Sequence, residues 1–266
     1  MRTRSGWQRE WVRAIAGLAL VAYGCSRGSE PAVPVAATPE PAQLLQVMFD
    51  TLAHARTLTF KATRQLDAAL AVGGSVAESA SIEVWVSRPQ MIRARSTSEA
   101  GARVFYADGQ HVSLIDEGMK VYATAPLPGT IDDVVNALDE RYGFTPPLAE
   151  FVLNDPSKKF ATQIQSSQYK GSEAVNGVEC NHIALTGEVA DADLWISIAD
   201  HLPRRLVATF KDREGSPQLK VDFSDWNLTP SLEASLFVFD PPKDAYKIAM
   251  RTSDDANAGD AKGGTR

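Results

Sequence analysis

Two residues whose side chains can bind a metal lie close together in the sequence, at Cys180 and His182. Residues two apart on a β-strand point to the same side, and thiolate and imidazole groups are both zinc ligands. The other histidines, His54, His111 and His201, lie far from this pair in the sequence. A cysteine packed beside a half-buried histidine is therefore the better interpretation, and we predict no metal and no cofactor.

Sequence motifs for catalysis are not found. The chain has no nucleophile elbow, no phosphate-binding glycine loop and no HExxH segment. Asp191 with Asp193, and Asp222 with Asp225, have the spacing of paired carboxylates, but such pairs at strand edges are mostly solvated. We predict no catalytic residues and a protein that is not an enzyme.

Arg204 and Arg205 follow Pro203 at the start of a predicted strand. Two neighbouring guanidinium groups can bind a carboxylate or a phosphate, so a lipid head group is one candidate ligand. The alternative is that both arginines form ion pairs with acids on neighbouring strands. The sequence leaves both interpretations open.

The other cysteine, Cys25, ends the stretch LVAYGC and follows a segment typical of export signals. Residues 1–13 carry four arginines and one glutamate, and an apolar run follows over residues 14–22. That run is too short to span a bilayer, which takes roughly 20 residues. The pattern predicts a signal peptide over residues 1–24.

A bacterial lipoprotein signal is similar to this stretch and places the lipidated cysteine directly after a small residue. Gly24 fits that pattern, Ala22 is acceptable and Tyr23 is unusual. The resemblance implies a lipidated Cys25 that anchors the protein to a membrane, and Ser26 implies the outer membrane. A plain signal peptide cleaved near Cys25, or an uncleaved anchor, is the alternative.

Composition divides the rest of the chain into three parts. Residues 25–40 combine the lipidated cysteine with a Pro/Ala-rich segment that we expect to be a flexible tether. Residues 41–250 are enough for one domain, and residues 251–266 are predicted to be a disordered tail. Without residues 1–24 the formal charge moves from −6 to about −9, because four arginines and one glutamate are lost. This acidity disfavours nucleic acid as a partner.

Periodicity predicts the elements of the domain. A helix is expected over residues 43–56, and two more at 131–142, after the cap Thr130, and at 148–154. Alternating apolar residues between turn signals predict antiparallel strands. These lie at 58–62, 82–86, 103–107, 111–115, 120–124, 178–185, 193–198, 205–211, 219–226 and 235–239. Ten strands can be placed in this way, and with one further strand in the first group the predicted order is one helix, six strands, two helices and five strands.

This order is typical of an α+β domain, in which helices gather on one face of an antiparallel sheet. A single sheet of ten or eleven strands must curl to protect its apolar side. We therefore expect a large curved antiparallel sheet that forms a half-open β-barrel with a helical lid.

Three segments resemble a known family: YKGSEAVNGVECNHIAL (169–185), DLWISIADHLPRRLVATFKDREGSPQLKVDFSDWNLTP (193–230) and LFVFDPPKDAYKI (236–248). They are similar to an uncharacterised family of predicted periplasmic bacterial proteins, domain of unknown function 2092. That family is similar to LolA and LolB, lipoprotein carriers whose half-open barrel and helical lid enclose an apolar cavity. The resemblance implies a LolA/LolB-like fold and binding of acyl chains, lipids or lipoproteins, and it assigns no functional residue.

Alternation places one set of apolar side chains on the inner face of the sheet, opposite apolar residues of the lid. The sheet set is Ile82, Val84, Leu194, Ile196, Leu206, Phe210, Val221 and Phe223, and the lid set is Val134, Val135, Leu138, Phe151 and Val152. These side chains either pack solid or line a cavity for an apolar ligand.

Two hypotheses for function follow. The first is a non-catalytic, membrane-anchored lipoprotein of the periplasm that binds a hydrophobic ligand, or a lipoprotein, between the sheet and its lid. The second is an envelope interaction or stress-sensing module with a packed interior, no ligand and an envelope protein as its partner.

Overall fold

The computed structural model describes residues 38–70, 76–146, 148–250 and 252. The predicted signal peptide, Cys25, most of the predicted tether and nearly all of the predicted tail lie outside the described residues. The residues between Thr38 and Thr252 that the structure describes form one compact unit. In the described ranges, no helix combines the length and the apolar character that crossing a membrane requires.

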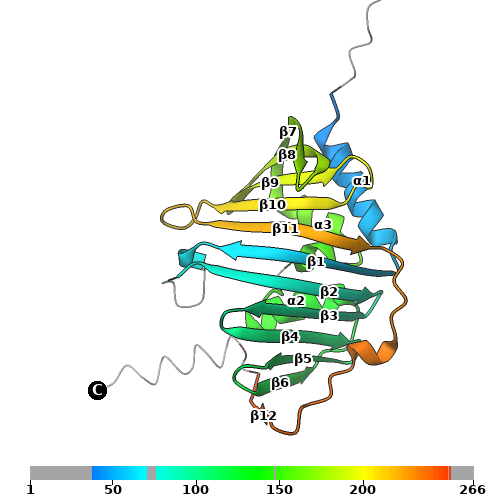
Figure 1. Ribbon diagram of the computed structural model, residues 1–266, viewed down its shortest axis with the longest axis vertical. Coiled ribbons are helices and arrows are strands. Elements are labelled where there is room, and N and C mark those ends of the chain that lie inside the picture. Colours follow the sequence, from blue (N-terminus) through cyan, green and yellow to red (C-terminus); the bar gives the residue numbers. More distant parts are fainter. Residues whose placement is uncertain (1–37, 71–75, 147, 251, 253–266) are drawn as a thin grey trace, which may run out of the picture. The chain divides into compact units, whose positions relative to one another are not determined.

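In the described part of the chain, a twelve-stranded sheet is the framework of this unit (Figure 1). Its strands are β1 (Thr57–Leu66), β2 (Glu78–Ser87), β3 (Met91–Ser98), β4 (Gly101–Asp108), β5 (His111–Asp116), β6 (Val121–Pro126), β7 (Ile164–Val175), β8 (Val178–Gly187), β9 (Ala190–Ser197), β10 (Pro203–Phe210), β11 (Gln218–Asn227) and β12 (Tyr246–Lys247). Their order across the sheet is β12-β6-β5-β4-β3-β2-β1-β11-β10-β9-β8-β7. Among the strands of the described ranges, only β12 pairs in parallel with its neighbour, and the edge strands β12 and β7 do not pair with each other.

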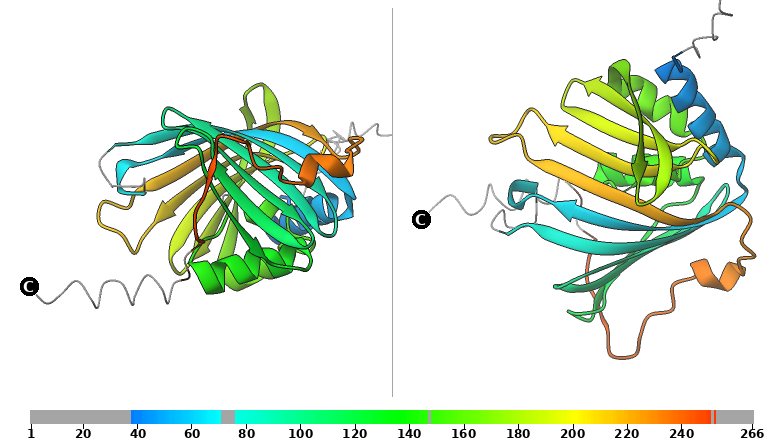
Figure 2. Two further views of the ribbon diagram at one scale, coloured as in Figure 1. Left: turned by 90° about the horizontal axis from the view of Figure 1, so that it is seen from below. Right: turned by 45° about the horizontal axis from the view of Figure 1, so that its top comes forward.

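The α-helices of the described residues lie on the concave side of the curved sheet (Figure 2). They are α1 (Pro41–His54), α2 (Ile131–Tyr142) and α3 (Pro156–Gln163). The start of α2 is fixed as predicted, because the Thr130 hydroxyl accepts a hydrogen bond from the Asp133 N–H and the Asp133 carboxylate accepts one from the Thr130 N–H. The α+β class and the open, curved antiparallel sheet are therefore confirmed.

The helices cover part of the concave face and form the core with it. From α1, Met48 and Leu52 are buried, and from α2, Val134 and Leu138 are buried against the inward-facing residues of the sheet. Aromatic rings fill the region near α3, where Phe151 packs edge-on against Phe223 at 4.9 Å between ring centroids. This part of the interior is tightly packed.

Arg88 connects the helices to the end of β2. Its guanidinium donates hydrogen bonds to the carbonyl oxygens of Ala55, Val152 and Leu153. Burial lowers the pKa of Arg88 to about 10, and nearby Asp132 acts in the opposite direction. The arginine thus satisfies backbone oxygens from two segments that would otherwise be buried without partners.

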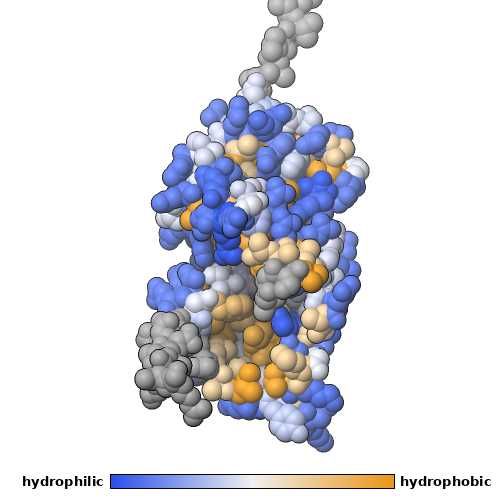
Figure 3. Space-filling model, turned by 90° about the vertical axis from the view of Figure 1, so that its left-hand side faces the viewer, coloured by the Kyte–Doolittle hydropathy of each residue, from blue (hydrophilic) through white to orange (hydrophobic). Residues whose placement is uncertain are grey.

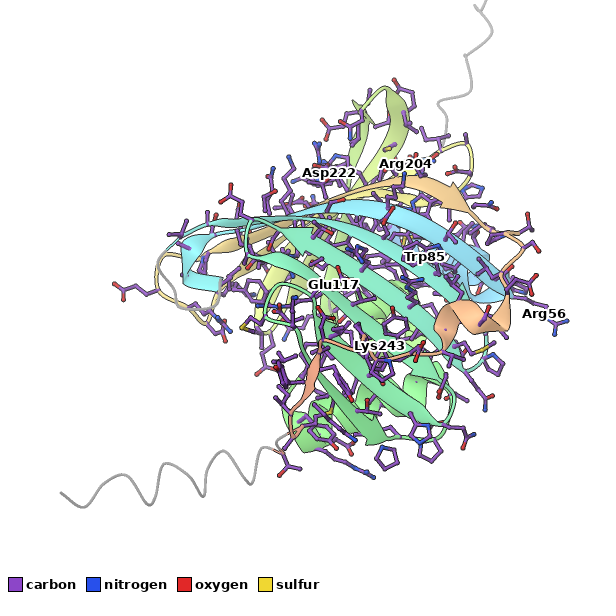
Figure 4. The ribbon with its side chains drawn as sticks, turned by 60° about the horizontal axis from the view of Figure 1, so that its bottom comes forward. Arg56, Trp85, Glu117, Arg204, Asp222 and Lys243 are labelled. Atoms are coloured by element: carbon purple, nitrogen blue, oxygen red, sulfur yellow. The ribbon has the colours of Figure 1, made fainter. Side chains whose placement is uncertain are left out.

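The C-terminal segment over residues 228–245 crosses the convex face of the sheet before β12 joins its edge. The short helix η3 (Ala234–Phe237) lies against β3 and β4, and Phe237 is fully buried. Phe239 packs on Tyr106 and Tyr122, with ring centroids 5.4 and 5.3 Å away. In Figure 4 the stretch that carries Lys243 runs across the strands. The strand predicted at 235–239 is therefore wrong, because its alternating apolar residues pack onto the sheet and do not pair with an edge.

Other predicted elements also need correction. The helix predicted at 148–154 is only a short helix, η2 (Ala149–Phe151), preceded by Leu148 with a positive φ of 64°. The regular helix, α3, begins after it at Pro156. Strands β3 and β7 were not predicted individually, because β3 carries two arginines and β7 is an exposed edge strand with little apolar alternation.

Candidate ligand-binding cavity

On the inner, concave face of β1–β6, the register of the strands arranges the side chains in rows that differ in size and polarity. One row across the sheet consists of Phe60, Val84, Ala94, Phe105, Leu114 and Ala123. The next row toward one end of the strands consists of Ala62, Ile82, Ser96, Arg103, Asp116 and Val121. Beyond it lie Arg64, Ala80, Ser98 and Gly101. Alanine, serine and glycine are frequent in these rows, so the side chains of the sheet do not fill the space in front of it.

The space left in front of these rows is a cavity of about 520 Å³. This volume lies within the range of roughly 300–1,000 Å³ that is usual for small-molecule sites. Apolar side chains from β4, β5 and β6 form its wall, among them Phe105, Leu114 and Val121. The segment after α2 closes the opposite side with Phe144 and Pro146. The cavity therefore suits an apolar ligand.

The mouth of the cavity is ringed by exposed apolar side chains. Figure 3 shows a hollow with an apolar surface on the side of the domain that faces the viewer. Three of its residues come from separate segments, and their exposed fractions are 66% for Met119, 37% for Phe144 and 49% for Ile248. Large apolar groups at such exposure are typical of a binding surface when they gather at one place.

Two ion pairs lie among the residues that line the cavity. The Arg64 guanidinium contacts the Glu78 carboxylate, and both side chains are largely buried. The Arg103 Nε donates to Asp116 Oδ2 at 2.9 Å, and the Arg103 side chain is about half exposed. The cavity thus combines an apolar interior with charged groups close to the strand ends.

Asp116 accepts a backbone hydrogen bond in addition to its ion pair with Arg103. Its Oδ1 accepts a hydrogen bond from the Met119 N–H at 2.8 Å. This bond and the hydrogen bond from Arg103 hold the pKa of Asp116 below its ordinary value of 3.8. The carboxylate therefore stays ionised and fixes the turn that carries Met119.

A second, much smaller gap of about 10 Å³ extends from the cavity beneath α2 and η2. Ala94, Phe105 and Pro146 border both spaces. The gap could hold no more than about one water molecule, so the side chains under α2 are nearly in contact. The large cavity ends where the lid begins to pack against the sheet.

The structure places one of the predicted lining residues at this cavity, four at the small gap and the others elsewhere in the domain. Ile82 lines the cavity, and Val84, Val134, Val135 and Val152 border the small gap. Leu138, Phe151, Leu194, Ile196, Val221 and Phe223 are buried in the packed core, and Leu206 is partly buried against it. Phe210 lies apart from that cluster, with the Arg213 guanidinium 5.7 Å from its ring centroid. A binding role for these residues stays a prediction.

Arg204 and Arg205 are both paired with acids. Arg204 contacts Asp200, and Arg205 contacts Asp222 on the neighbouring strand β11. Leu206 packs against the core, and Arg205 precedes it on the same strand. Because neighbouring side chains on a strand point to opposite faces, Arg205 lies on the convex face. Arg204 and Asp222 are labelled in Figure 4. The two arginines do not line the cavity, and a head-group contact by them stays a prediction.

Cys180 and His182 do not come together with further metal ligands. Cys180 is a buried free thiol that donates to the Val178 carbonyl oxygen, and burial raises its pKa. The His182 ring stacks on Trp195 at 4.2 Å and its Nε2 lies 2.7 Å from Asp193 Oδ1. Within the described ranges, no group of three or more His, Cys, Asp or Glu side chains could hold a metal ion.

Of the residues predicted to line a cavity, only Ile82 lines the large one, and the sequence reasoning missed the rest of its lining. The signal for these residues lies in β3, whose inward-facing residues Ile92, Ala94, Ser96 and Ser98 become smaller and more polar along the strand. Core strands keep large side chains on the inner face, so a strand that loses them predicts a hollow. Apolar alternation alone identifies the filled half of the face.

Comparison with known proteins identifies a family for this chain. The sequence model of the family described as "Predicted periplasmic protein (DUF2092)" matches residues 41–251. No curated protein sequence matches the chain significantly.

Several solved structures are similar to this one at low sequence identity. The lipoprotein LppX of Mycobacterium tuberculosis is 12% identical, with a TM-score of 0.43, over 72% of this chain and 97% of that one. A LolA superfamily protein of Nitrosomonas europaea is 11% identical, with a TM-score of 0.36, over 76% of this chain and 99% of that one. The complex of MucA and MucB of Pseudomonas aeruginosa gives 12% identity and a TM-score of 0.41 over 75% of this chain, which spans only 60% of the matched chain.

Proposed function

Because the chain belongs to the DUF2092 family of predicted periplasmic proteins, we propose that it is a non-catalytic envelope protein that binds the acyl chain of a lipid or lipoprotein. The observation that supports this proposal is the cavity of about 520 Å³ in front of β1–β6. Its wall is largely apolar, and its opening is ringed by Met119, Phe144 and Ile248.

An acyl chain suits this site for energetic reasons. Each methylene group moved from water into an apolar environment contributes about 0.8 kcal/mol. A chain seated against Phe105, Leu114 and Val121 would gain this contribution along its buried length. The ligand would also cover the wall of the cavity, which is otherwise exposed to water.

The proposal includes a membrane anchor. Lipidation of Cys25 would attach the protein to a membrane, preferably the outer membrane, and residues 25–40 would act as the tether. Intact-mass analysis of protein extracted from membranes tests this part. An N-terminal cysteine carrying acyl groups is the expected result, and an unmodified N-terminus at or near that position would contradict it.

Ligand binding is tested with the full chain purified from the cell envelope. Organic extraction followed by mass spectrometry should recover acyl lipids in stoichiometric amounts, and a fluorescent fatty-acid analogue should bind the stripped protein. Ala94→Leu should abolish that binding, because it places a large side chain in the cavity. Thr97→Leu is the matched control, since Thr97 is an exposed residue on the other face of β3. Lipid-free protein that does not bind the analogue would contradict the proposal.

The exposed mouth favours a second proposed role, docking to an envelope protein. Met119, Phe144 and Ile248 together offer an apolar contact surface around the opening. Photo-crosslinking from position 119 in cells should give one product of defined mass if a protein docks there. Crosslinks to lipid alone would leave the ligand-binding role without a protein partner and contradict the docking role.

A further inference from the structure

Three of the described residues lie between the large cavity and the small gap beneath the lid. Ala94 on β3 and Phe105 on β4 stand directly opposite each other in the antiparallel register. Together with Pro146, which follows α2, they border both spaces. Ala94 carries only a methyl group, whereas Phe105 carries a ring and is only 7% exposed. The Phe105 ring is therefore the largest of these groups at the inner end of the cavity.

The space behind Phe105 is apolar. Every described residue that borders the small gap is apolar, among them Ile92 on β3, Val134 on α2 and Val152 after η2. Because the gap continues the apolar character of the cavity, burial of ligand carbon atoms there would be as favourable as in the cavity itself. The cavity therefore ends at the Phe105 ring, and not at a change in polarity.

The rows of the inner face orient an amphiphile in the cavity. Arg103 and Asp116 stand opposite each other in the row beside the turn that carries Met119, at the mouth. Phe105 and Leu114 stand opposite each other in the row that lies farther in. Burial of methylene groups is favourable, whereas burial of a polar head without partners costs free energy. A bound chain therefore points its methyl end inward, toward Phe105.

From these observations we infer that Phe105 sets the maximum length of the acyl chain that the cavity accepts, because the methyl end of a bound chain stops against the Phe105 ring. This inference rests on the proposed function, and it adds chain length as a property that the cavity selects. Carbon atoms beyond the limit stay in water outside the mouth. A longer chain therefore gains nothing over one that just fills the cavity.

Competition against a fluorescent fatty-acid analogue tests the inference with saturated fatty acids from octanoate to arachidate, each below its critical micelle concentration. Each added methylene group should tighten binding by about fourfold until the chain reaches Phe105, and further methylene groups should add nothing. An affinity that rises up to the longest acid would overturn the inference, although the cavity binds chains. If the analogue itself does not bind, the proposed function has failed.

Variants assign the length limit to Phe105. Phe105→Ala removes the ring and joins the cavity to the gap, so the limit should move to chains longer by about two to four methylene groups, because neighbouring residues relax into only part of the space. Phe105→Leu keeps more of the packing and should move the limit in the same direction by a smaller amount. Thermal denaturation shows which variants are folded, and Phe105→Leu carries the test if Phe105→Ala does not fold.

Phe49→Ala and Phe49→Leu are the matched controls for loss of a buried ring. Phe49 on α1 is 5% exposed and packs on Phe160 of α3, with ring centroids 4.7 Å apart. It is not among the described residues that border the cavity or the gap, so its replacement should leave the length limit unchanged. A limit that stays in place in a folded Phe105 variant, or that moves equally in the Phe49 variant, would overturn the assignment.

Discussion

At the scale of single residues, Asp116 shows how one side chain organises the mouth of the cavity. It accepts hydrogen bonds from Arg103 and from the N–H of Met119, so it joins β4 to the turn before β6. The same turn presents the exposed Met119 side chain to solvent. The shape of the mouth therefore depends on an ionised carboxylate.

Replacement of Asp116 should make this dependence measurable. The pKa of Asp116 is lowered in the folded protein, so its stabilisation is present above the ordinary value of 3.8 and is lost as the pH falls through the lowered pKa. Asp116→Asn should cost about 1–3 kcal/mol of unfolding free energy at neutral pH. The difference from the unchanged protein should shrink in acid, as measured by urea denaturation over a pH series.

Asp225→Asn provides the control for this measurement. Asp225 pairs with Lys61, and both side chains are more than half exposed. Exposed pairs contribute little, so we expect an effect below about 1 kcal/mol. An Asp116 variant that behaves like the Asp225 variant at every pH would contradict the proposed role of Asp116.

At the scale of elements, the inner face of the sheet is divided between a filled half and a hollow half. Ala107 on β4 is fully buried in the packed core, whereas Ala94 on β3 lines the cavity. The same substitution should therefore have opposite consequences at the two positions.

Ala107→Leu should destabilise the protein by about 1–3 kcal/mol, because overpacking forces neighbouring side chains to move. Ala94→Leu should leave stability unchanged or increase it, because the added carbon atoms enter open space. Thermal and urea denaturation of both variants checks this contrast. Equal destabilisation would mean that the space in front of Ala94 is filled in solution.

The C-terminal segment is the second element with a specific role, because it covers the outer face of the strands that carry the cavity. Phe237→Ala removes a fully buried ring between this segment and the sheet. We expect a loss of about 3–5 kcal/mol in unfolding free energy, as is usual for such cavities in a core. Val238→Ala is the matched control, since Val238 is 56% exposed and should have little effect. A small effect of Phe237→Ala would show that the segment is only loosely attached.

At the scale of the whole molecule, the sequence predicts the fold class and most of the order of elements, but it does not predict the cavity. The Thr130 cap, the alternating strands and the turn glycines act locally, so their patterns predict α2 and most of the sheet. The strand expected at 235–239 failed because Phe237 and Phe239 alternate in order to pack on the convex face. Alternation reports which side chains are buried, but it does not report whether they pair or what covers them.

Apolar alternation did not predict the location of the binding site, for a related reason. Val221 and Phe223 have the pattern of a lining surface, but they are covered by Phe151 and its neighbours. The residues that face open space, such as Ala94 and Ser96, carry little apolar signal.

Photo-crosslinking with a fatty acid that carries a diazirine near its methyl end tests the central claim most directly. After irradiation of the full-length protein, peptide mapping should place the label on β4–β6, at residues such as Phe105, Leu114 and Val121. An excess of palmitate should prevent labelling. Labelling confined to β7–β10, or labelling that palmitate does not reduce, would contradict a ligand site in front of β1–β6.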